Sequence, residues 1–183
     1  MLAHLANVLT TCRLLAAVPV AFLVVEEVDH LAFWLFLAAA LTDLADGYVA
    51  KRWAGPSSVG AALDPVADKL FAGALFLAVA SRELVPLWLV VLVIGRDVVL
   101  VAGALLLRNR LSDFRVEPLV IGKISTFLQL TFLGFLLGEA AEIAEVGAVV
   151  ALLLPLTAAV TLISAIAYLV VGLRLVGGAV RAA

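Results

Sequence analysis

The chain has 183 residues, of which 66% are hydrophobic and 14% are charged, and its mean hydropathy is +1.23. Soluble domains have apolar residues at roughly half of their positions and charges at about a quarter, so this composition excludes an ordinary soluble domain. The formal net charge of -2 excludes the strongly basic surface that nucleic-acid binding requires. We therefore expect a single membrane domain over residues 1–183, surrounded by membrane lipids and without a nucleic-acid partner.

Apolar stretches follow one another along the chain, with short polar connections between them. A membrane-spanning helix takes about 20 apolar residues, and these stretches have that length. They predict six transmembrane helices, over residues 5–25, 31–50, 61–80, 86–107, 119–137 and 148–173. The first stretch lacks the basic leader of a signal peptide and carries Arg13 in its middle, so we expect it to be a retained helix.

Charges are segregated between alternate connections. The second and fourth connections and the tail hold two acids, Asp113 and Glu117, against the basic residues Lys51, Arg52, Arg108, Arg110, Arg115, Arg174 and Arg181. The other connections hold the acidic residues Glu26, Glu27, Asp29, Glu83, Glu139, Glu142 and Glu145, with Arg82 as their one base. Because cytosolic loops are enriched in Lys and Arg, we expect both termini to be cytosolic.

Further charged residues lie within the predicted helices: Arg13, Asp43, Asp46, Asp64, Asp68, Lys69, Arg96, Asp97 and Lys123. An aspartate in the middle of a membrane helix costs about 2.5 to 3.5 kcal/mol on insertion scales. The four aspartates of the second and third helices must therefore face a wet or metal-filled interior.

The depths of these four aspartates match in pairs. At a rise of about 1.5 Å per residue, Asp46 and Asp64 lie at similar distances from the cytosolic ends of their helices, and Asp43 and Asp68 lie deeper by similar amounts. Spacings of three and four residues place the two acids of each helix on one face. The sequence therefore predicts four converging carboxylates in the cytosolic half of the membrane.

Carboxylates this close repel one another unless protons or cations neutralise them. Oxygen-only ligands favour hard cations such as Mg²⁺, with Mn²⁺ and Ca²⁺ as further possibilities. Because Mg²⁺ is usually bound by carboxylates together with substrate phosphates, we expect a phosphate-bearing ligand. Gly47, Ala50 and Gly60 leave backbone-lined room for it beside the acids.

The segment that contains these residues resembles the signature of the CDP-alcohol phosphotransferase family, DxxDGxxARx(8)GxxxDxxxD. The matching positions, each at the family's spacing, are Asp43, Asp46, Gly47, Ala50, Gly60, Asp64 and Asp68. The one departure is Lys51, where the family usually has arginine. A lysine keeps the positive charge but loses bidentate phosphate binding.

Three other segments resemble the glycerophospholipid branch of that family, so the resemblance covers nearly the whole chain. They are the stretch from Asn7 to Arg13, the triplet Gly95-Arg96-Asp97, and the GKxxTxxQ element that begins at Gly122-Lys123. The branch includes phosphatidylglycerophosphate synthases and CMP-forming cardiolipin synthases. The Arg-Asp version of the triplet, with the tail from Ala167 to Arg174, leans toward the cardiolipin type.

The resemblance implies an all-α integral membrane protein with six transmembrane helices, both termini cytosolic, a polar cavity open to the cytosolic side, and often a homodimer. It implies metal-dependent transfer of a phosphatidyl group from CDP-diacylglycerol to an alcohol, with release of CMP. The acceptor expected for this branch is a glycerol-type alcohol, either glycerol 3-phosphate or phosphatidylglycerol. The lack of a transit peptide before the first helix favours a bacterial inner (plasma) membrane.

The matching positions also imply roles for individual residues. Asp43, Asp46 and Asp64 would bind Mg²⁺ or Mn²⁺, and Asp68 would complete a two-metal site and act as the catalytic base. The residues that would border the nucleotide or contact its phosphates are Gly47, Ala50, Lys51 and Gly60.

Three cations inside the membrane have open roles. Arg96 either pairs with an aspartate or forms an acceptor-phosphate pocket with Lys123, and one residue can do both. Arg13 either neutralises the aspartates or contacts the acceptor phosphate. The polar residues Ser125, Thr126 and Gln129 of the fifth predicted helix are expected to form interhelical hydrogen bonds.

Two other classes of protein compete with the enzyme hypothesis. Intramembrane carboxylates also mark ion pathways, so a divalent-cation transporter is the main alternative. Against it, the last three predicted helices contain no mirrored acidic set of the kind that an inverted repeat would supply. The other is a non-catalytic membrane scaffold, which would gain nothing from buried acids. The aspartates could also pair internally with Arg13, Lys69 or Lys123 to hold helices together, but few bases lie at a matching depth.

Overall fold

The computed structural model describes residues 17–53, 60–110 and 119–182, and it describes side chains within 17–42, 69–104 and 119–175. Within these ranges the chain is helical and contains no strand. A helical segment over 17–25 is followed by five longer helices: α2 (Asp29–Trp53), α3 (Gly60–Ser81), α4 (Leu87–Arg110), α5 (Val120–Ala140) and α6 (Gly147–Ala182).

The predicted helices are confirmed as helices, with shifts of a few residues at most of their ends. The helical segment that ends at residue 25 matches the end of the first predicted helix, while residues 1–16 and Arg13 lie outside the described residues. The largest difference is at α6, which continues to Ala182 rather than ending at residue 173. Its internal Pro155 is accommodated, as is common in membrane helices.

Three helices of the described part are long and apolar enough to cross a membrane: Leu87–Ala104, Val120–Ala140 and Gly147–Leu175. Shorter apolar helices cover Asp29–Thr42 and Lys69–Ser81, the parts of α2 and α3 whose side chains are described. The described part of the chain therefore has helices typical of a membrane protein.

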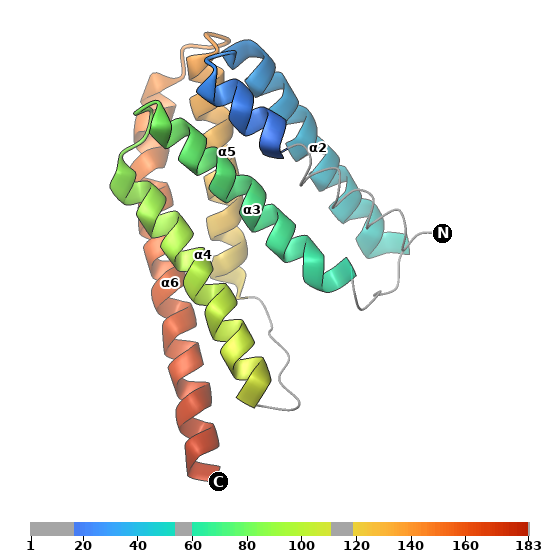
Figure 1. Ribbon diagram of the computed structural model, residues 1–183, viewed down its shortest axis with the longest axis vertical. Helices are drawn as coiled ribbons and strands as arrows, with labels where there is room; N and C mark the ends of the chain where they lie inside the picture. The colour runs from blue at the N-terminus through green and yellow to red at the C-terminus, as the bar shows by residue number, and fades with distance from the viewer. Residues whose placement is uncertain (1–16, 54–59, 111–118, 183) are drawn as a thin grey trace.

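The bundle is built around α5, which packs against α6, α2 and α3, while α4 packs against α6 and α3 (Figure 1). Apolar side chains fill the contacts, and the rings of Phe76 and Phe132 stack at 6.3 Å between α3 and α5. Fully buried members of this core include Val20, Val24, Leu75, Val79, Leu89, Val93, Leu133 and Leu137. Van der Waals packing of this kind drives helix association in a lipid environment.

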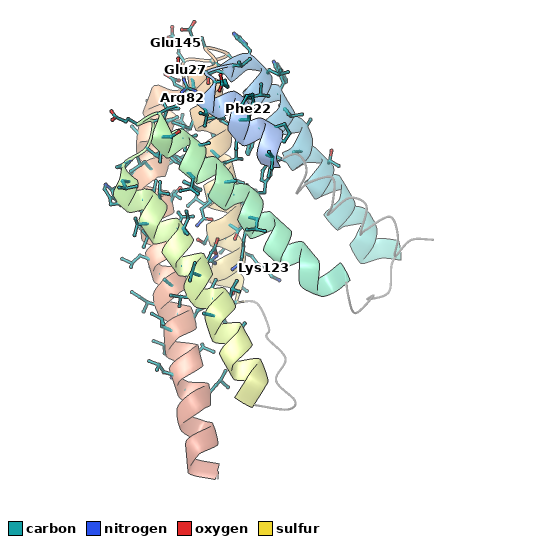
Figure 2. All side chains as sticks on the ribbon, viewed as in Figure 1. Phe22, Glu27, Arg82, Lys123 and Glu145 are labelled. Atoms are coloured by element: carbon teal, nitrogen blue, oxygen red, sulfur yellow. The ribbon has the colours of Figure 1, made fainter. Side chains whose placement is uncertain are left out.

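The acidic connections lie together at one end of the molecule. Figure 2 shows Glu27, Arg82 and Glu145 at this end, and Lys123 far from them along the bundle. Arg82 forms two hydrogen bonds with the carboxylate of Asp29, one of them 3.0 Å from Nη2 to Oδ2, and so ties the turn between α3 and α4 to the start of α2. These hydrogen bonds raise the pKa of Arg82 above its ordinary value. We call the end that carries Glu27, Arg82 and Glu145 the acidic end.

Candidate active site

The four signature aspartates lie on two consecutive helices, α2 and α3, which form a helical hairpin. Asp43 and Asp46 belong to the second half of α2, and Asp64 and Asp68 belong to the start of α3. Figure 1 shows the two helices running in opposite directions, with the end of α2 and the start of α3 on the same side of the molecule. The two halves of the signature thus lie on helix segments at the same side of the molecule.

The side chains of these aspartates lie outside the described part, so the predicted convergence of carboxylates remains a prediction. Among the side chains that the structure does describe, no group of three His, Cys, Asp or Glu residues could hold a metal ion. The donor set consists of carboxylates from the second half of α2 and the start of α3, and oxygen ligands of this kind fit a hard cation such as Mg²⁺ or Mn²⁺.

The other signature residues follow the same hairpin. Gly47, Ala50 and Lys51 lie in the last turns of α2, and Gly60 is the first residue of α3. Their side-chain environments, like those of the aspartates, lie outside the described residues. The helix boundaries nevertheless place all of them near the connection between the two helices.

Arg96 is the best-defined member of the predicted site. Its side chain is buried on α4, with 4% of the residue exposed. Nε and Nη2 donate to Oγ of Ser164 at 3.3 and 3.0 Å, Nη2 also donates to the carbonyl of Gly122 at 3.3 Å, and Nη1 donates to Oδ1 of Asp97 at 2.5 Å. Four of the five N–H groups of the guanidinium are therefore used within the protein. Of the two roles considered for Arg96, pairing with an aspartate is observed.

The hydrogen bonds of Arg96 continue to a second cation. Nζ of Lys69 on α3 lies 3.2 Å from Oδ1 of Asp97, the same oxygen that accepts from Arg96. Because one carboxylate serves two cations, this group has a net positive charge. We call Lys69, Asp97, Arg96 and Ser164 the four-helix polar network, since with the Gly122 carbonyl it joins α3, α4, α5 and α6.

The ring of Tyr168 on α6 packs against Arg96 of this network. The centroid of its ring lies 5.8 Å from the guanidinium carbon of Arg96, within the range of a cation–π contact. Its hydroxyl accepts a hydrogen bond of 3.0 Å from the backbone N–H of Leu119, the residue before α5. A Cβ on Gly122 would come within 2.5 Å of that hydroxyl, so a larger residue there would displace the Tyr168 ring.

Lys123 follows Gly122 and is exposed, and Figure 2 shows it on the part of α5 remote from the acidic end. Ser125 and Gln129 form the predicted interhelical hydrogen bonds with Thr161 of α6, at 3.2 and 3.0 Å between side-chain atoms. Thr126 instead donates to the Gly122 carbonyl within α5. The interhelical prediction is therefore confirmed for two of these three residues.

The comparisons with known proteins agree with the signature. The family model described as CDP-alcohol phosphatidyltransferase matches residues 3–173. The chain belongs to this family. The CDP-alcohol phosphatidyltransferase family is a family of enzymes. It includes the two kinds expected from the sequence, the cardiolipin synthases and the phosphatidylglycerophosphate synthases.

Relatives of both kinds match the chain. A CMP-forming cardiolipin synthase of Homo sapiens is 34% identical over 140 residues, which cover 68% of this chain and 46% of that protein. A probable phosphatidylglycerophosphate synthase of Mycobacterium tuberculosis is 30% identical over 185 residues, covering 97% of this chain and 85% of that protein. A CDP-diacylglycerol–glycerol-3-phosphate 3-phosphatidyltransferase of Aquifex aeolicus is 33% identical over 130 residues, covering 69% and 72%. The chain spans less than half the length of the human cardiolipin synthase.

The sequence did not predict the contacts that Ser164 and Tyr168 of α6 make with Arg96, or the contact of Lys69 with Asp97. Thr157, Thr161, Ser164 and Tyr168 recur at spacings of four, three and four residues, which places them on one face of α6. The first three are fully buried. That polar periodicity within an apolar helix was the signal that could have identified Ser164 and Tyr168.

Proposed function

We propose that the protein transfers a phosphatidyl group from CDP-diacylglycerol to a glycerol-type alcohol, glycerol 3-phosphate or phosphatidylglycerol, and releases CMP. The observation that carries this proposal is the complete set of signature acids on the antiparallel hairpin of α2 and α3. It is supported by the family match over residues 3–173 and by the names of the relatives, which include a CMP-forming enzyme and one that acts on CDP-diacylglycerol and glycerol 3-phosphate.

In the proposed site, Asp43, Asp46, Asp64 and Asp68 hold two Mg²⁺ or Mn²⁺ ions. Bound metal neutralises the pyrophosphate of the donor and stabilises the charge of the attacking and leaving oxygens. Carboxylates from two helices suit this role because hard divalent cations bind oxygen ligands from more than one element.

Asp68 is the proposed catalytic base. It accepts the proton of the acceptor hydroxyl as the hydroxyl oxygen forms a bond to the phosphorus of the phosphatidyl group. The bond between that phosphorus and the oxygen of CMP breaks, and CMP leaves with the electron pair. A base must lie within hydrogen-bond reach of the hydroxyl that it deprotonates, and Asp68 is the deeper acid of α3.

The remaining signature residues are proposed to bind the donor nucleotide. Gly47, Ala50 and Gly60 border the cytidine, because their small side chains allow it to approach the helix backbone. Lys51 contacts the donor phosphates as a point charge. The water-soluble nucleotide thus enters from the cytosol while the acyl chains of the donor stay in the bilayer.

The acceptor phosphate is proposed to bind near the start of α5. Lys123 is exposed there and supplies the direct positive charge, while Arg96 contributes through the one N–H that its protein partners leave over. Arg13 is proposed as a further contact of this phosphate or of the aspartates.

We also propose six spans, both termini in the cytosol, a polar cavity open to that side, a homodimer, and a bacterial plasma membrane as the location. The acidic turns lie together at one end of the bundle, which leaves the positively charged connections for the other end. This supports the orientation, because positively charged connections usually face the cytosol. Bacterial relatives that match most of the chain support the location.

The proposal is tested by CMP release from the purified full chain in detergent, with CDP-diacylglycerol, Mg²⁺ or Mn²⁺, and each of the two acceptors in turn. We expect release that requires metal and one acceptor and that Asp68→Asn abolishes. Asp29→Asn, an aspartate of the acidic end, is the matched control and should retain activity. Absence of CMP with both acceptors and both metals would contradict the proposal, and cation flux into proteoliposomes would then favour the transporter.

A further inference from the structure

A continuous set of polar contacts links α6 to the residue that follows Asp68. It runs from Ser164 through Arg96 and Asp97 to Lys69, with contacts of 3.0, 2.5 and 3.2 Å. Charged groups inside a membrane bundle are costly and mark function. This network ends at Lys69, next to the proposed metal ligand Asp68, so we consider a role for it in the metal site as well as in helix association.

The inner part of the network has partners on several helices. Arg96 has partners on α4, α5 and α6, and Tyr168 covers its guanidinium. These partners fix the position of Asp97, whose side chain is 13% exposed. Asp97 in turn determines where the ammonium group of Lys69, 23% exposed, can lie.

The contact of Lys69 with Asp97 restrains the rotation of α3 about its own axis, because Lys69 must face α4 to reach that carboxylate. Successive residues of an α-helix point about 100° apart, so the direction of Asp68 follows from that of Lys69. Asp64 lies about one turn away on the same face as Asp68. A rotation of α3 would therefore displace both of these proposed metal ligands together, while Asp43 and Asp46 on α2 would stay in place.

We propose that Lys69 and Asp97 are positioning residues that set the rotation of α3 and thereby hold Asp64 and Asp68 in metal-binding geometry. Arg96 and Ser164 act through Asp97. The inference rests on the proposed function only in assigning Asp64 and Asp68 as metal ligands. Groups that orient metal ligands without touching the metal commonly change metal affinity by about 10- to 100-fold when they are removed.

The test measures Mn²⁺ binding to the purified full chain in detergent, from the electron paramagnetic resonance signal of free Mn²⁺, and in parallel the rate of CMP release. Lys69→Met and Asp97→Asn should each raise the dissociation constant for Mn²⁺ about tenfold. The double variant should bind Mn²⁺ no more weakly than the weaker of the two single variants, because both changes break the contact between Lys69 and Asp97. Lys69→Arg retains the ion pair and should bind Mn²⁺ within about twofold of the wild-type protein. Lys69→Gln replaces Lys69→Met if the latter does not fold.

Arg82 and Asp29 provide a matched control, since they form another cation–aspartate pair that joins distant parts of the chain, from the turn after α3 to the start of α2 at the acidic end. Arg82→Met and Asp29→Asn should lower the melting temperature without changing the Mn²⁺ dissociation constant. This control separates a general loss of stability from a loss of metal-site geometry.

The outcomes distinguish the two proposals. If the wild-type protein binds Mn²⁺ and loses CMP release on Asp68→Asn, while Lys69→Met leaves Mn²⁺ affinity unchanged, the positioning role is wrong and the proposed function stands. A raised KM for the acceptor with unchanged Mn²⁺ affinity would also overturn it, because Lys69 would then contact substrate. If the wild-type protein neither binds Mn²⁺ nor releases CMP, both proposals fail.

Discussion

Glu27, Glu83 and Glu142 have backbone φ angles of 60°, 58° and 52°. For residues with a Cβ, this left-handed region costs roughly 1 to 2 kcal/mol. Each glutamate follows the end of a helix, and the N–H of the next residue returns to a helix carbonyl, as from Ile143 to Gly138 at 3.0 Å. This is the hydrogen bond of a Schellman motif, in which glycine is usual. A glutamate in place of glycine thus adds a negative charge to each turn, and the positive φ angle makes the folded backbone less stable there.

Glu142→Gly should therefore stabilise the protein by about 1 kcal/mol, because glycine adopts a positive φ without the steric penalty. Thermal unfolding in detergent measures the change. Glu145→Gly is the control in the same turn, since Glu145 has no positive φ, and it should give no stabilisation. Equal effects of the two variants would show that charge rather than backbone conformation is responsible.

Gly122→Ala should destabilise the protein by about 1 to 3 kcal/mol, the usual cost of overpacking. The added Cβ would lie 2.5 Å from the Tyr168 hydroxyl and 2.9 Å from a ring carbon, so the ring that covers Arg96 would have to move. Gly73→Ala is the matched control, because nothing lies within 4 Å of a Cβ there. A wild-type melting temperature for Gly122→Ala would contradict the packing described for Tyr168.

At the level of helices, sequence patterns located most boundaries because hydropathy and turn residues are local properties. The predicted end of α6 at residue 173 is wrong, because Arg174 lies within the helix and a long basic side chain can extend from a helix toward water. Sequence patterns did not show which side chains of different helices contact one another. The contact of Ser164 with Arg96 and that of Lys69 with Asp97 depend on how helices pack, which periodicity alone does not determine.

The hydrogen bonds between α5 and α6 predict the effect of a buried substitution. Thr161→Val removes the partner of Gln129 and Ser125, and we expect a loss of about 0.6 to 1.7 kcal/mol, the range typical of interhelical hydrogen bonds in membranes. Unfolding of the detergent-solubilised protein measures it. Thr131→Val is the control, because Thr131 bonds only within its own helix, to the Phe127 carbonyl, among the described contacts. A neutral Thr161→Val would mean that these hydrogen bonds contribute little.

Across the whole molecule, the separation of charge was predictable because it follows from counting residues in alternate connections. The hairpin that carries the four aspartates was predictable from the spacing of the signature, and helix bounds agree with it. The four-helix polar network was not, although Arg96 and Lys123 were recognised as candidates. A single sequence identifies charges within a membrane but not the helix from which each partner comes.

The proposed orientation can be tested by labelling introduced cysteines, since Cys12 is the one native cysteine. In a Cys12→Ser background, Glu145→Cys should react with a membrane-impermeant maleimide in right-side-out vesicles. Arg110→Cys, at the end of α4, should react only in inverted vesicles. Labelling of both positions from the same side would exclude the proposed number of spans.

The length of α6 has a practical consequence. Its 36 residues extend over about 54 Å at about 1.5 Å per residue, whereas the hydrocarbon layer is about 30 Å thick. Figure 1 shows α6 continuing past the end of α4. A fluorescent protein joined in helical register to its last turn would stand clear of the headgroups on a stiff stalk, and the polarisation of its emission would report the tilt of the bundle in a supported bilayer.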